Sequence, residues 1–348
     1  MTAADCTNLQ VIPFAGTDAE WNRFVEAAEG GTFCHHSGWL RIMADVLGHE
    51  PVYTVAVDGD GSWQGVLPLV RVRSRLFGDY LISMPFLNYG GPLGTQSAQA
   101  GLARHAVEGA KRLGVDLLEL RARRSVPSDL RISDRKVTVL LDLPPSAETL
   151  WRERFSGKLR SQIRRPQKEG MEARFGVDQL DPFYEVFARN MRDLGTPVLP
   201  RKLFERILSA LPDIADVGAV YFEGQPVAAG WGFVWQDEFE MTWASSLREH
   251  NRRAPNMLLY WSFMERMIER GVQVFNFGRC TPDGGTHRFK RQWGGVDAPL
   301  PWAQWSPGDV EATPSPDRPL FRLATAAWGR LPLALANRIG PVLARQLP

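Results

Sequence analysis

The chain has few cysteines and no long hydrophobic run, and each absence excludes a class of protein. Its 348 residues contain three cysteines, Cys6, Cys34 and Cys280, without a CxxC motif or the Cys/His spacing of a zinc site. No stretch approaches the roughly 18 apolar residues that a membrane-spanning helix requires, and no basic region followed by an apolar run opens the sequence. We therefore expect a cytoplasmic protein that binds no metal.

An excess of one charge is absent as well. The formal net charge is +2, which is too small to indicate a nucleic-acid-binding protein. Hydrophobic residues make up 44% and charged residues 23% of the chain, as in soluble globular proteins. The length is sufficient for two domains and a tail. Any electrostatic function must therefore come from local clusters of charge.

The chain contains two copies of one pattern, in which a β-hairpin, a strand, a helix and a further strand follow one another. In the first copy these elements are expected at residues 52–57 and 63–70, 80–83, 96–113 and 117–120. In the second copy they are expected at residues 219–222 and 227–234, 239–243, 256–270 and 274–277. Two α/β modules of similar topology explain this order better than one large sheet.

The predicted domains are residues 1–145, 146–305 and a linker with a basic tail at 306–348. The first boundary follows Leu143-Pro144-Pro145, where a strand-like run ends in two prolines. From Arg318 onward the tail has five arginines and no acidic residue. Two interpretations remain open: peripheral contact with an anionic membrane, or packing onto the second domain through Phe321, Leu323, Trp328 and Leu331. Prolines limit the length of an amphipathic helix, which favours packing.

Two basic clusters are candidate phosphate sites. The run KLRSQIRR at residues 158–165 places Arg160 and Arg164 on one helical face, and Pro166 should kink or end this helix. Arg252 and Arg253 precede a helix that starts near Pro255-Asn256, where free backbone N–H groups attract anions. Arginines suit phosphate recognition. In both cases a solvated basic surface remains the alternative.

A third candidate is the segment FGRCTPDGGTHRFKRQWG at residues 277–294. Its glycines allow the backbone to approach a ligand closely. Lys290, just beyond the loop, is of a type that stabilises the oxyanion formed when an amine attacks a carbonyl. A tight turn with a solvated lysine is the alternative. Cys280 has no histidine placed to activate it, so we expect it not to be a nucleophile.

Residues 151–176, 187–200 and 277–294 resemble proteins of the FemAB family. Segments of the first half, including PFLNYGGPL at residues 85–93, resemble the same family. The resemblance covers residues 8–305 and is strongest to the branch associated with exosortase (PEP-CTERM) and exopolysaccharide loci. Its most specific parts are RFKRQWG and KLRSQIRR.

The resemblance implies an α/β fold of two tandem GNAT-like domains, in agreement with the repeated pattern. FemAB proteins transfer an amino acid from aminoacyl-tRNA to the amine of a peptidoglycan precursor, and close relatives of the family are acyl-CoA-dependent acetyltransferases. By resemblance, Phe289 and Lys290 match the Phe-Lys pair of the acyl-transfer centre. Arg160 matches an arginine that binds the phosphates of the acceptor nucleotide, and Arg41, after Trp39, stands in the place of a phosphate-binding lysine.

The helical arm of many tRNA-dependent members has no counterpart between Lys158 and Trp231, which disfavours tRNA as the donor. We predict an acyltransferase that moves an acyl or aminoacyl group from acyl-CoA or aminoacyl-tRNA to an amine of a cell-envelope or exopolysaccharide precursor. The expected mechanism is direct transfer in a cleft between the modules, with Asp193 or Glu240 as the base. The alternative is a non-catalytic binding protein for an acidic glycan or a nucleotide-sugar.

The predicted site residues form three groups. The catalytic group is Lys290, Phe289, Asp193 and Glu240. The substrate-binding group is Arg160, Arg164, Lys158, Arg41, Tyr89, Arg279, Thr286 and Arg288. The cofactor-binding group, for the donor, is Arg252, Arg253 and Asn256.

Overall fold

The computed structural model describes residues 9–309 and 319–347, which form parts of two compact units. Of the described residues, unit 1 comprises residues 9–136, 299–309 and 345–347, and unit 2 comprises residues 137–298 and 319–344. Each unit has its own mixed β-sheet covered by helices. The predicted architecture of two α/β modules is therefore confirmed.

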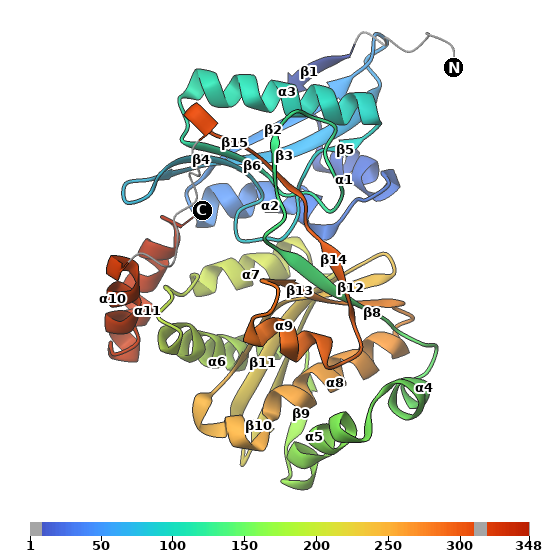
Figure 1. Cartoon of the computed structure of the whole chain (residues 1–348), viewed down its shortest axis with the longest axis vertical. Coiled ribbons are helices and arrows are strands. Elements are labelled where there is room, and N and C mark those ends of the chain that lie inside the picture. The colour runs from blue at the N-terminus through green and yellow to red at the C-terminus, as the bar shows by residue number, and fades with distance from the viewer. Residues whose placement is uncertain (1–8, 310–318, 348) are drawn as a thin grey trace. The chain divides into compact units, whose positions relative to one another are not determined.

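The sheet of unit 1 has the strand order β1-β2-β3-β4-β6-β15-β7, and β5 pairs with β3. Its strands are β1 (Gln10–Pro13), β2 (Glu50–Val57), β3 (Trp63–Ser74), β4 (Gly78–Ser83), β5 (Leu93–Gly94), β6 (Leu117–Leu120), β7 (Arg131–Ser133) and β15 (Trp302–Trp305). Its helices are α1 (Asp18–Ala27), η1 (Phe33–His35), α2 (Gly38–Arg41), η2 (Ile42–Val46), α3 (Gln96–Leu113) and η6 (Pro307–Asp309). The long helix α3 lies along this sheet (Figure 1) and buries Leu102, Ala103 and Ala106 against it.

The sheet of unit 2 has the order β14-β8-β13-β12-β11-β10-β9. Its strands are β8 (Val137–Asp142), β9 (Glu172–Phe175), β10 (Ala215–Phe222), β11 (Gln225–Trp235), β12 (Glu238–Ser246), β13 (Val274–Cys280) and β14 (Val296–Pro299). Its helices are α4 (Ala147–Thr149), η3 (Leu150–Arg154), α5 (Gly157–Lys168), η4 (Val177–Gln179), α6 (Leu180–Asp193), α7 (Arg201–Ala210), η5 (Arg248–Arg253), α8 (Pro255–Glu269), α9 (Gly285–Arg291), α10 (Pro319–Trp328) and α11 (Leu333–Ala344).

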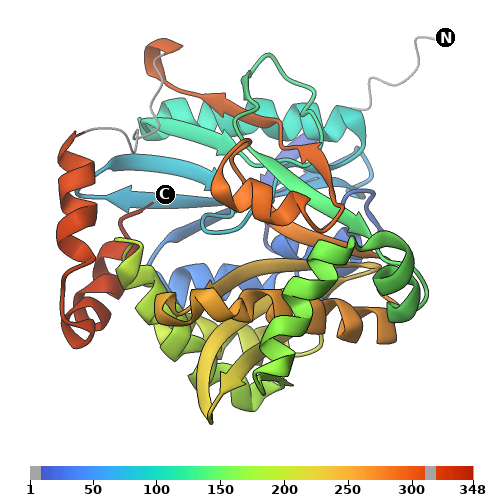
Figure 2. The same cartoon turned by 60° about the horizontal axis from the view of Figure 1, so that its bottom comes forward.

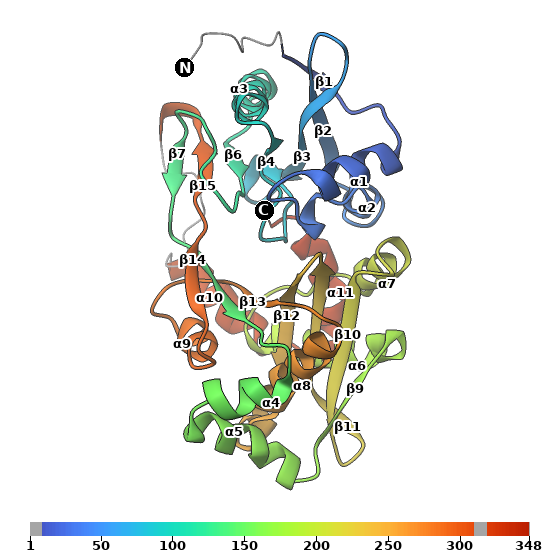
Figure 3. The ribbon, with the colours of Figure 1, turned by 90° about the vertical axis from the view of Figure 1, so that its right-hand side faces the viewer.

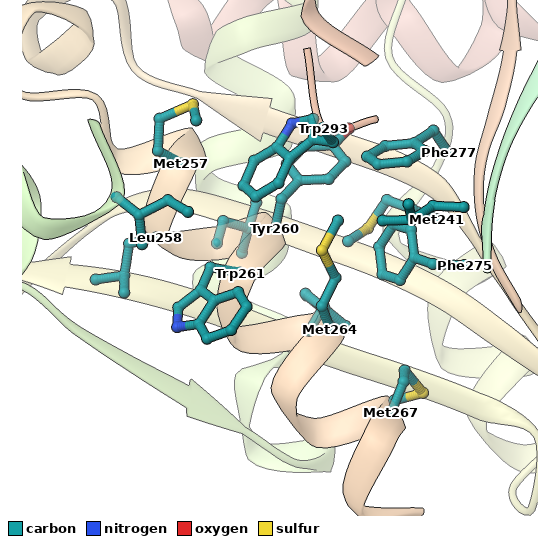
Figure 4. Close-up of a cluster of buried hydrophobic side chains, with 14 of the residues drawn as sticks. Met241, Met257, Leu258, Tyr260, Trp261, Met264, Met267, Phe275, Phe277 and Trp293 are labelled. Carbon is teal, nitrogen blue, oxygen red and sulfur yellow. The ribbon is translucent and has the colours of Figure 1, made fainter. Parts of the chain in front are cut away.

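Helices cover both faces of the unit 2 sheet, as the edge-on view in Figure 3 shows. Successive residues of β11 point to opposite faces. The ring centroid of Trp231 lies 5.2 Å from that of Phe183 on α6, whereas Gly230 leaves room for Phe263 on α8. The core around α8 is rich in aromatic and methionine side chains (Figure 4), including Tyr260 and Trp293.

Two strands lie in a different unit from the one that the sequence predicts. β8 pairs with β13, with Leu141 opposite Phe275, and so contributes to unit 2 instead of closing the first module. β15 pairs with β6, with Ala303 opposite Leu120, and so contributes to unit 1. The compact units therefore divide before Val137, and the domain boundary at residue 145 stays a prediction. Strand pairing between segments distant in sequence leaves no local signal.

The sequence predicts that Pro166 kinks or ends helix α5. The helix continues past Pro166 to Lys168, so the proline does not end it. Pro166 is buried, and its carbonyl accepts hydrogen bonds from the N–H groups of Glu169 and Met171. The helix thus ends two residues after its proline, and Arg160 and Arg164 lie within it ahead of the proline. Figure 2 shows α5 crossing α8.

The tail contributes helices to unit 2. α11 packs against α6, and Ala336, Gly340 and Ala344 are buried. In the part of the tail that the structure describes, this agrees with the packing interpretation, although the side chains of Phe321 and Leu323 lie outside the described set. The predicted linker falls largely on residues 310–318, which are also outside it. Among the described residues no helix combines the length and the hydropathy of a membrane span.

Candidate functional site

The sheet of unit 2 opens between β12 and β13. The two strands pair in parallel only through Glu238, Phe239 and Glu240, the last of which lies opposite Asn276. Beyond this point β12 continues beside β11 and β13 continues beside β8. A β-bulge in β12 opposite Trp231 lies just past the opening, where it increases the local twist. Residues 241–246 therefore present one backbone edge without a strand partner in the described chain.

Lys290 on α9 lies at the β13 side of this opening. Only 5% of the residue is exposed, and its Nζ donates to the carbonyls of Gly278 at 2.6 Å and Arg279 at 3.0 Å. Burial lowers the pKa of Lys290 to about 8, against the opposing effect of Glu240 and Cys280 nearby. The ammonium group of a lysine has three N–H donors. The hydrogen bonds to the two carbonyls use two of them, so one N–H is left for a ligand.

A buried polar network supports the opening. Asn276 is fully buried. Its Nδ2 donates to Glu238 at 2.8 Å and, more weakly, to Glu240 at 3.4 Å. Its Oδ1 accepts from Thr138 Oγ1 at 2.5 Å and from the Gly278 N–H at 2.8 Å. Both the N–H groups and the oxygen of the Asn276 amide are hydrogen-bonded. The amide therefore fixes the carboxylates of Glu238 and Glu240 relative to the end of β13.

The two predicted bases have different surroundings. Glu240 is 1% exposed and close enough to Lys290 to influence its pKa. Asp193 ends α6, where its carboxylate pairs with Arg192 at 2.6 Å and its carbonyl accepts from Arg248 at 2.5 Å. The structure thus brings Glu240, and not Asp193, into electrostatic contact with the lysine.

The residues predicted to bind the acyl donor lie at the start of α8. Ala254 precedes the helix in a left-handed conformation, Pro255 is its first residue, and no side chain caps it. Asn256 Oδ1 is buried without a partner among the described residues. Arg253 pairs with Glu169 at 2.8 Å and lies over the ring of Phe222. An uncapped helix N-terminus with an arginine beside it suits an anion.

Arg160 and Arg164 meet at a second place in unit 2, a cavity of about 720 Å³. Nη1 of Arg160 donates to the carbonyls of Trp151 at 3.1 Å and Arg152 at 3.2 Å. The guanidinium of Arg164 lies over the ring of Trp151. Helices α4, α5 and α8 and the π-helical turn η3 form the walls.

The remaining candidates in unit 2 lie at the surface or at its margin. Lys158, Arg252, Thr286 and Arg288 are exposed, and Arg279 is half-buried. Arg288 donates to the carbonyl of Asp283 at 2.8 Å, which fixes the loop before α9. Phe289 packs with its ring centroid 5.0 Å from that of Tyr260, so its role in this structure is to anchor α9.

Two candidates belong to unit 1. Arg41 is 72% exposed and pairs with Asp18 at 2.9 Å. Tyr89 is 1% exposed beneath the guanidinium of Arg123. Tyr89 lines a small cavity of about 100 Å³.

Unit 1 has the same strand arrangement as unit 2, with β4 and β6 in the places of β12 and β13. In unit 1, however, residues of the unit itself fill the opening between these two strands. β4 and β6 pair in parallel as far as Ile82 and Glu119. Beyond them, Arg121 donates its N–H to Ser83 Oγ at 2.6 Å and accepts from the Gly91 N–H at 2.8 Å. Arg121 also donates to the carbonyl of Leu87 at 3.1 Å. Helix α3, which follows residues 83–91 in the chain, is capped by Thr95. Residues 83–91 thus occupy the place where unit 2 is open.

Sequence reasoning missed several residues that complete these sites. Asn276 is a polar residue inside the apolar strand FNFG, which is a visible signal. Thr138 carries no such signal, because its bond to Asn276 joins segments far apart in the chain. Trp261 and Glu265 lie on the wall of the large cavity but, in sequence, look like ordinary positions of an amphipathic helix.

Comparison with known proteins identifies the class. Residues 153–291 match the family described as "Acetyltransferase (GNAT) domain". The fold is similar to that of FemX, with 15% identity, a TM-score of 0.65 and coverage of 91% of this chain and 100% of FemX. It is also similar to the C-terminal domain of a putative lysylphosphatidylglycerol synthetase from Agrobacterium fabrum, with 14% identity, a TM-score of 0.58 and coverage of 89% and 97%. A comparison with curated sequences gives no significant match.

The matched domain and the duplicated sheet together define the protein as an acyltransferase of the GNAT class. Its tandem arrangement is that of FemAB-like proteins. The predicted fold and enzyme class are confirmed, whereas the exosortase-associated branch and the individual site residues stay predictions.

Proposed function

We propose that the protein transfers an acyl group from acyl-CoA to an amine, with the donor thioester at the opening between β12 and β13. The observation that carries this proposal is the position of Lys290, which is buried at the opening with one donor unused by the main chain. An unpaired strand edge binds an extended ligand through backbone hydrogen bonds, and the start of α8 attracts the phosphates of the donor. The acceptor class is an amine of a cell-envelope or exopolysaccharide precursor.

In the proposed reaction the amine nitrogen attacks the thioester carbonyl carbon. The carbonyl oxygen becomes an oxyanion that Lys290 stabilises. The carbon–sulfur bond then breaks, the thiolate of CoA leaves, and the proton released by the amine passes to Glu240 or to water. No covalent enzyme intermediate is required, because both substrates are held together.

Donor binding tests this function most directly. We expect acetyl-CoA to raise the melting temperature of the protein and to release CoA when a library of amines is supplied. Charged tRNA serves as the competing donor in the same assay. Stabilisation and product formation with charged tRNA alone would contradict the choice of acyl-CoA. Intact-mass detection of an acylated amine separates transfer from binding without catalysis.

Arg253→Ala should weaken acyl-CoA binding by about 1 to 3 kcal/mol, the magnitude of a lost hydrogen bond to a charged group. Arg253 is 42% exposed on its side chain, so added salt should reproduce part of the loss. Isothermal titration calorimetry at two salt concentrations measures both effects. The matched control is Lys202→Ala. Lys202 is exposed on α7, so this substitution removes one positive charge at a distance from the start of α8. Equal affinities of the Arg253 and Lys202 variants would exclude Arg253 from the donor site.

The tail also supports a proposed contact with anionic membranes. Leu335 and Val342 are 43% and 61% exposed on the face of α11 that also carries Arg338, which is exposed. Each basic residue near such a surface contributes on the order of 1 kcal/mol. We expect Arg330→Glu/Arg338→Glu to reduce flotation with anionic vesicles, while Lys202→Glu leaves it unchanged. Equal flotation of both variants would rule out this contact.

A further inference from the structure

Unit 1 contains a cavity that the proposed reaction does not use. It has a volume of about 630 Å³, within the range of about 300 to 1,000 Å³ of pockets that hold small organic ligands. Helix α3 forms one wall, residues 127–130 form a second, and Trp305 on β15 forms a third. These residues all belong to unit 1, so the cavity shares none with the opening of unit 2 at Lys290.

Small side chains on α3 create this space. Ala100, Ala103 and Val107 follow one another at intervals of three and four residues, so they share one face of the helix. Alternate residues of a strand point to the same face, and on β15 both Ala303 and Trp305 pack with the core beneath α3. The two alanine methyl groups on the helix are too short to cover the indole, and Trp305 stays half-buried.

The charged residues of the walls are two cations and one carboxylate, Arg104, Lys111 and Asp129. All three are exposed, and in the part of the chain that the structure describes none of them is ion-paired. Arg104 and Lys111 are two helical turns apart, about 10 Å along the axis of α3, so they project from the same side of the helix. Apolar walls with an excess of positive charge are complementary to a ligand that is both apolar and anionic.

We propose that this cavity binds a single-chain amphiphile with an anionic head group, an alkyl carboxylate or an alkyl phosphate. The chain lies along the apolar face of α3 and against Trp305, and the head group lies on the side of Arg104 and Lys111. Apart from Trp305 the apolar wall is aliphatic, which suits an alkyl chain better than a flat ring. The site is independent of the proposed acyl transfer and gives unit 1 a ligand class of its own.

Calorimetry of the whole chain with four matched probes, each below its critical micelle concentration, tests the proposal: decanoate, decyl phosphate, decanol and decyltrimethylammonium. We expect at least one anion to bind about tenfold more tightly than decanol, and the cation to bind more weakly than decanol. The tighter anion identifies the head group as a fatty carboxylate or a lipid phosphate. From octanoate to decanoate, or in the matching phosphates, affinity should rise about fourfold per methylene, which corresponds to about 0.8 kcal/mol.

Variants on α3 test the two parts of the site separately. Arg104→Ala/Lys111→Ala should weaken binding of the preferred anion about tenfold and leave that of decanol unchanged. The matched control is Arg112→Ala/Lys202→Ala, because Arg112 is exposed on the same helix and Lys202 on α7, and neither lines the cavity. Ala100→Trp places an indole ring in the cavity and should abolish binding of the anion and of decanol.

Affinity that does not change with chain length, or equal binding of the anions and of decyltrimethylammonium, would overturn the assignment of an alkyl anion. Equal affinities of the two double variants would overturn the site on α3, even if Ala100→Trp failed to fold. The Lys290→Ala variant should bind the amphiphile as the native protein does, because Lys290 does not line the cavity. Amphiphile binding in a protein without transferase activity would leave this site valid and the proposed reaction wrong, and transferase activity without amphiphile binding would show the reverse.

Discussion

Lys290→Ala should lower the turnover number more than tenfold and leave the melting temperature within a few degrees. The loss follows from the removal of one oxyanion donor, which costs about 100- to 1,000-fold in comparable enzymes. Acyl transfer to a verified amine under saturating donor measures it. Donor affinity, measured by calorimetry, should change little, because in the proposed mechanism the lysine stabilises the oxyanion that forms only during transfer. Full activity of the alanine variant would show that the transfer centre lies elsewhere.

The dependence of the turnover number on pH is a second test of the proposed role of Lys290. With a pKa lowered to about 8, the lysine is charged below this pH and loses the charge above it. Turnover should therefore fall as the pH rises through 8, even though the acceptor amine becomes more nucleophilic. Lys290→Arg keeps its charge at all these values, so any activity it retains should lack the descending limb.

Asn276→Asp should lower the free energy of unfolding by about 3 kcal/mol at pH 8 and by less at pH 5. The new carboxylate would stand beside Glu238 and Glu240 in a fully buried position. Like charges and burial raise its pKa in the folded state above the value in the unfolded chain. Its neutral form is therefore tolerated at low pH, and stability is lost as the pH rises.

Asn276→Leu is the matched control for this change. It removes the donation to Glu238, which the aspartate also removes, together with the hydrogen bonds accepted from Thr138 and the Gly278 N–H, and it adds no ionisable group. We expect it to be destabilised equally at pH 5 and pH 8 in urea titrations. If Asn276→Asp showed the same loss at both values, the carboxylates around the network would not be close enough to interact.

Local chemistry made much of the fold predictable. Gly114 ends α3 in a left-handed conformation, next to the predicted end of the helix at residue 113, and the turn at Asp58 joins β2 to β3 as the predicted hairpin requires. The sheets that receive β8 and β15 could not be predicted, because each strand pairs with a partner far away in the chain. Hydrophobic alternation marks a strand but carries no information on which sheet receives it.

The types of residue in the candidate site could be predicted from the sequence, but their burial and their hydrogen-bond partners could not. The segment RFKRQWG singled out Lys290, yet its burial and its two carbonyl partners depend on the end of β13. Asp193 looked equivalent to Glu240 in sequence, and its pairing with Arg192 distinguishes the two. The aromatic cavity arises from helices that meet only after α5 has crossed α8.

The filled opening of unit 1 has a consequence for how the duplicated chain works. Met84, which is buried, and Phe86, which is half-buried, adopt left-handed backbone conformations, which are costly for residues with side chains. The loop so formed satisfies the strand edge internally, as a bound substrate would. Among the described residues, this edge of unit 1 is bonded to residues 83–91, whereas the corresponding edge of unit 2 lacks a strand partner. A duplicated fold with one closed and one open edge offers a single place for an extended ligand to pair with a strand.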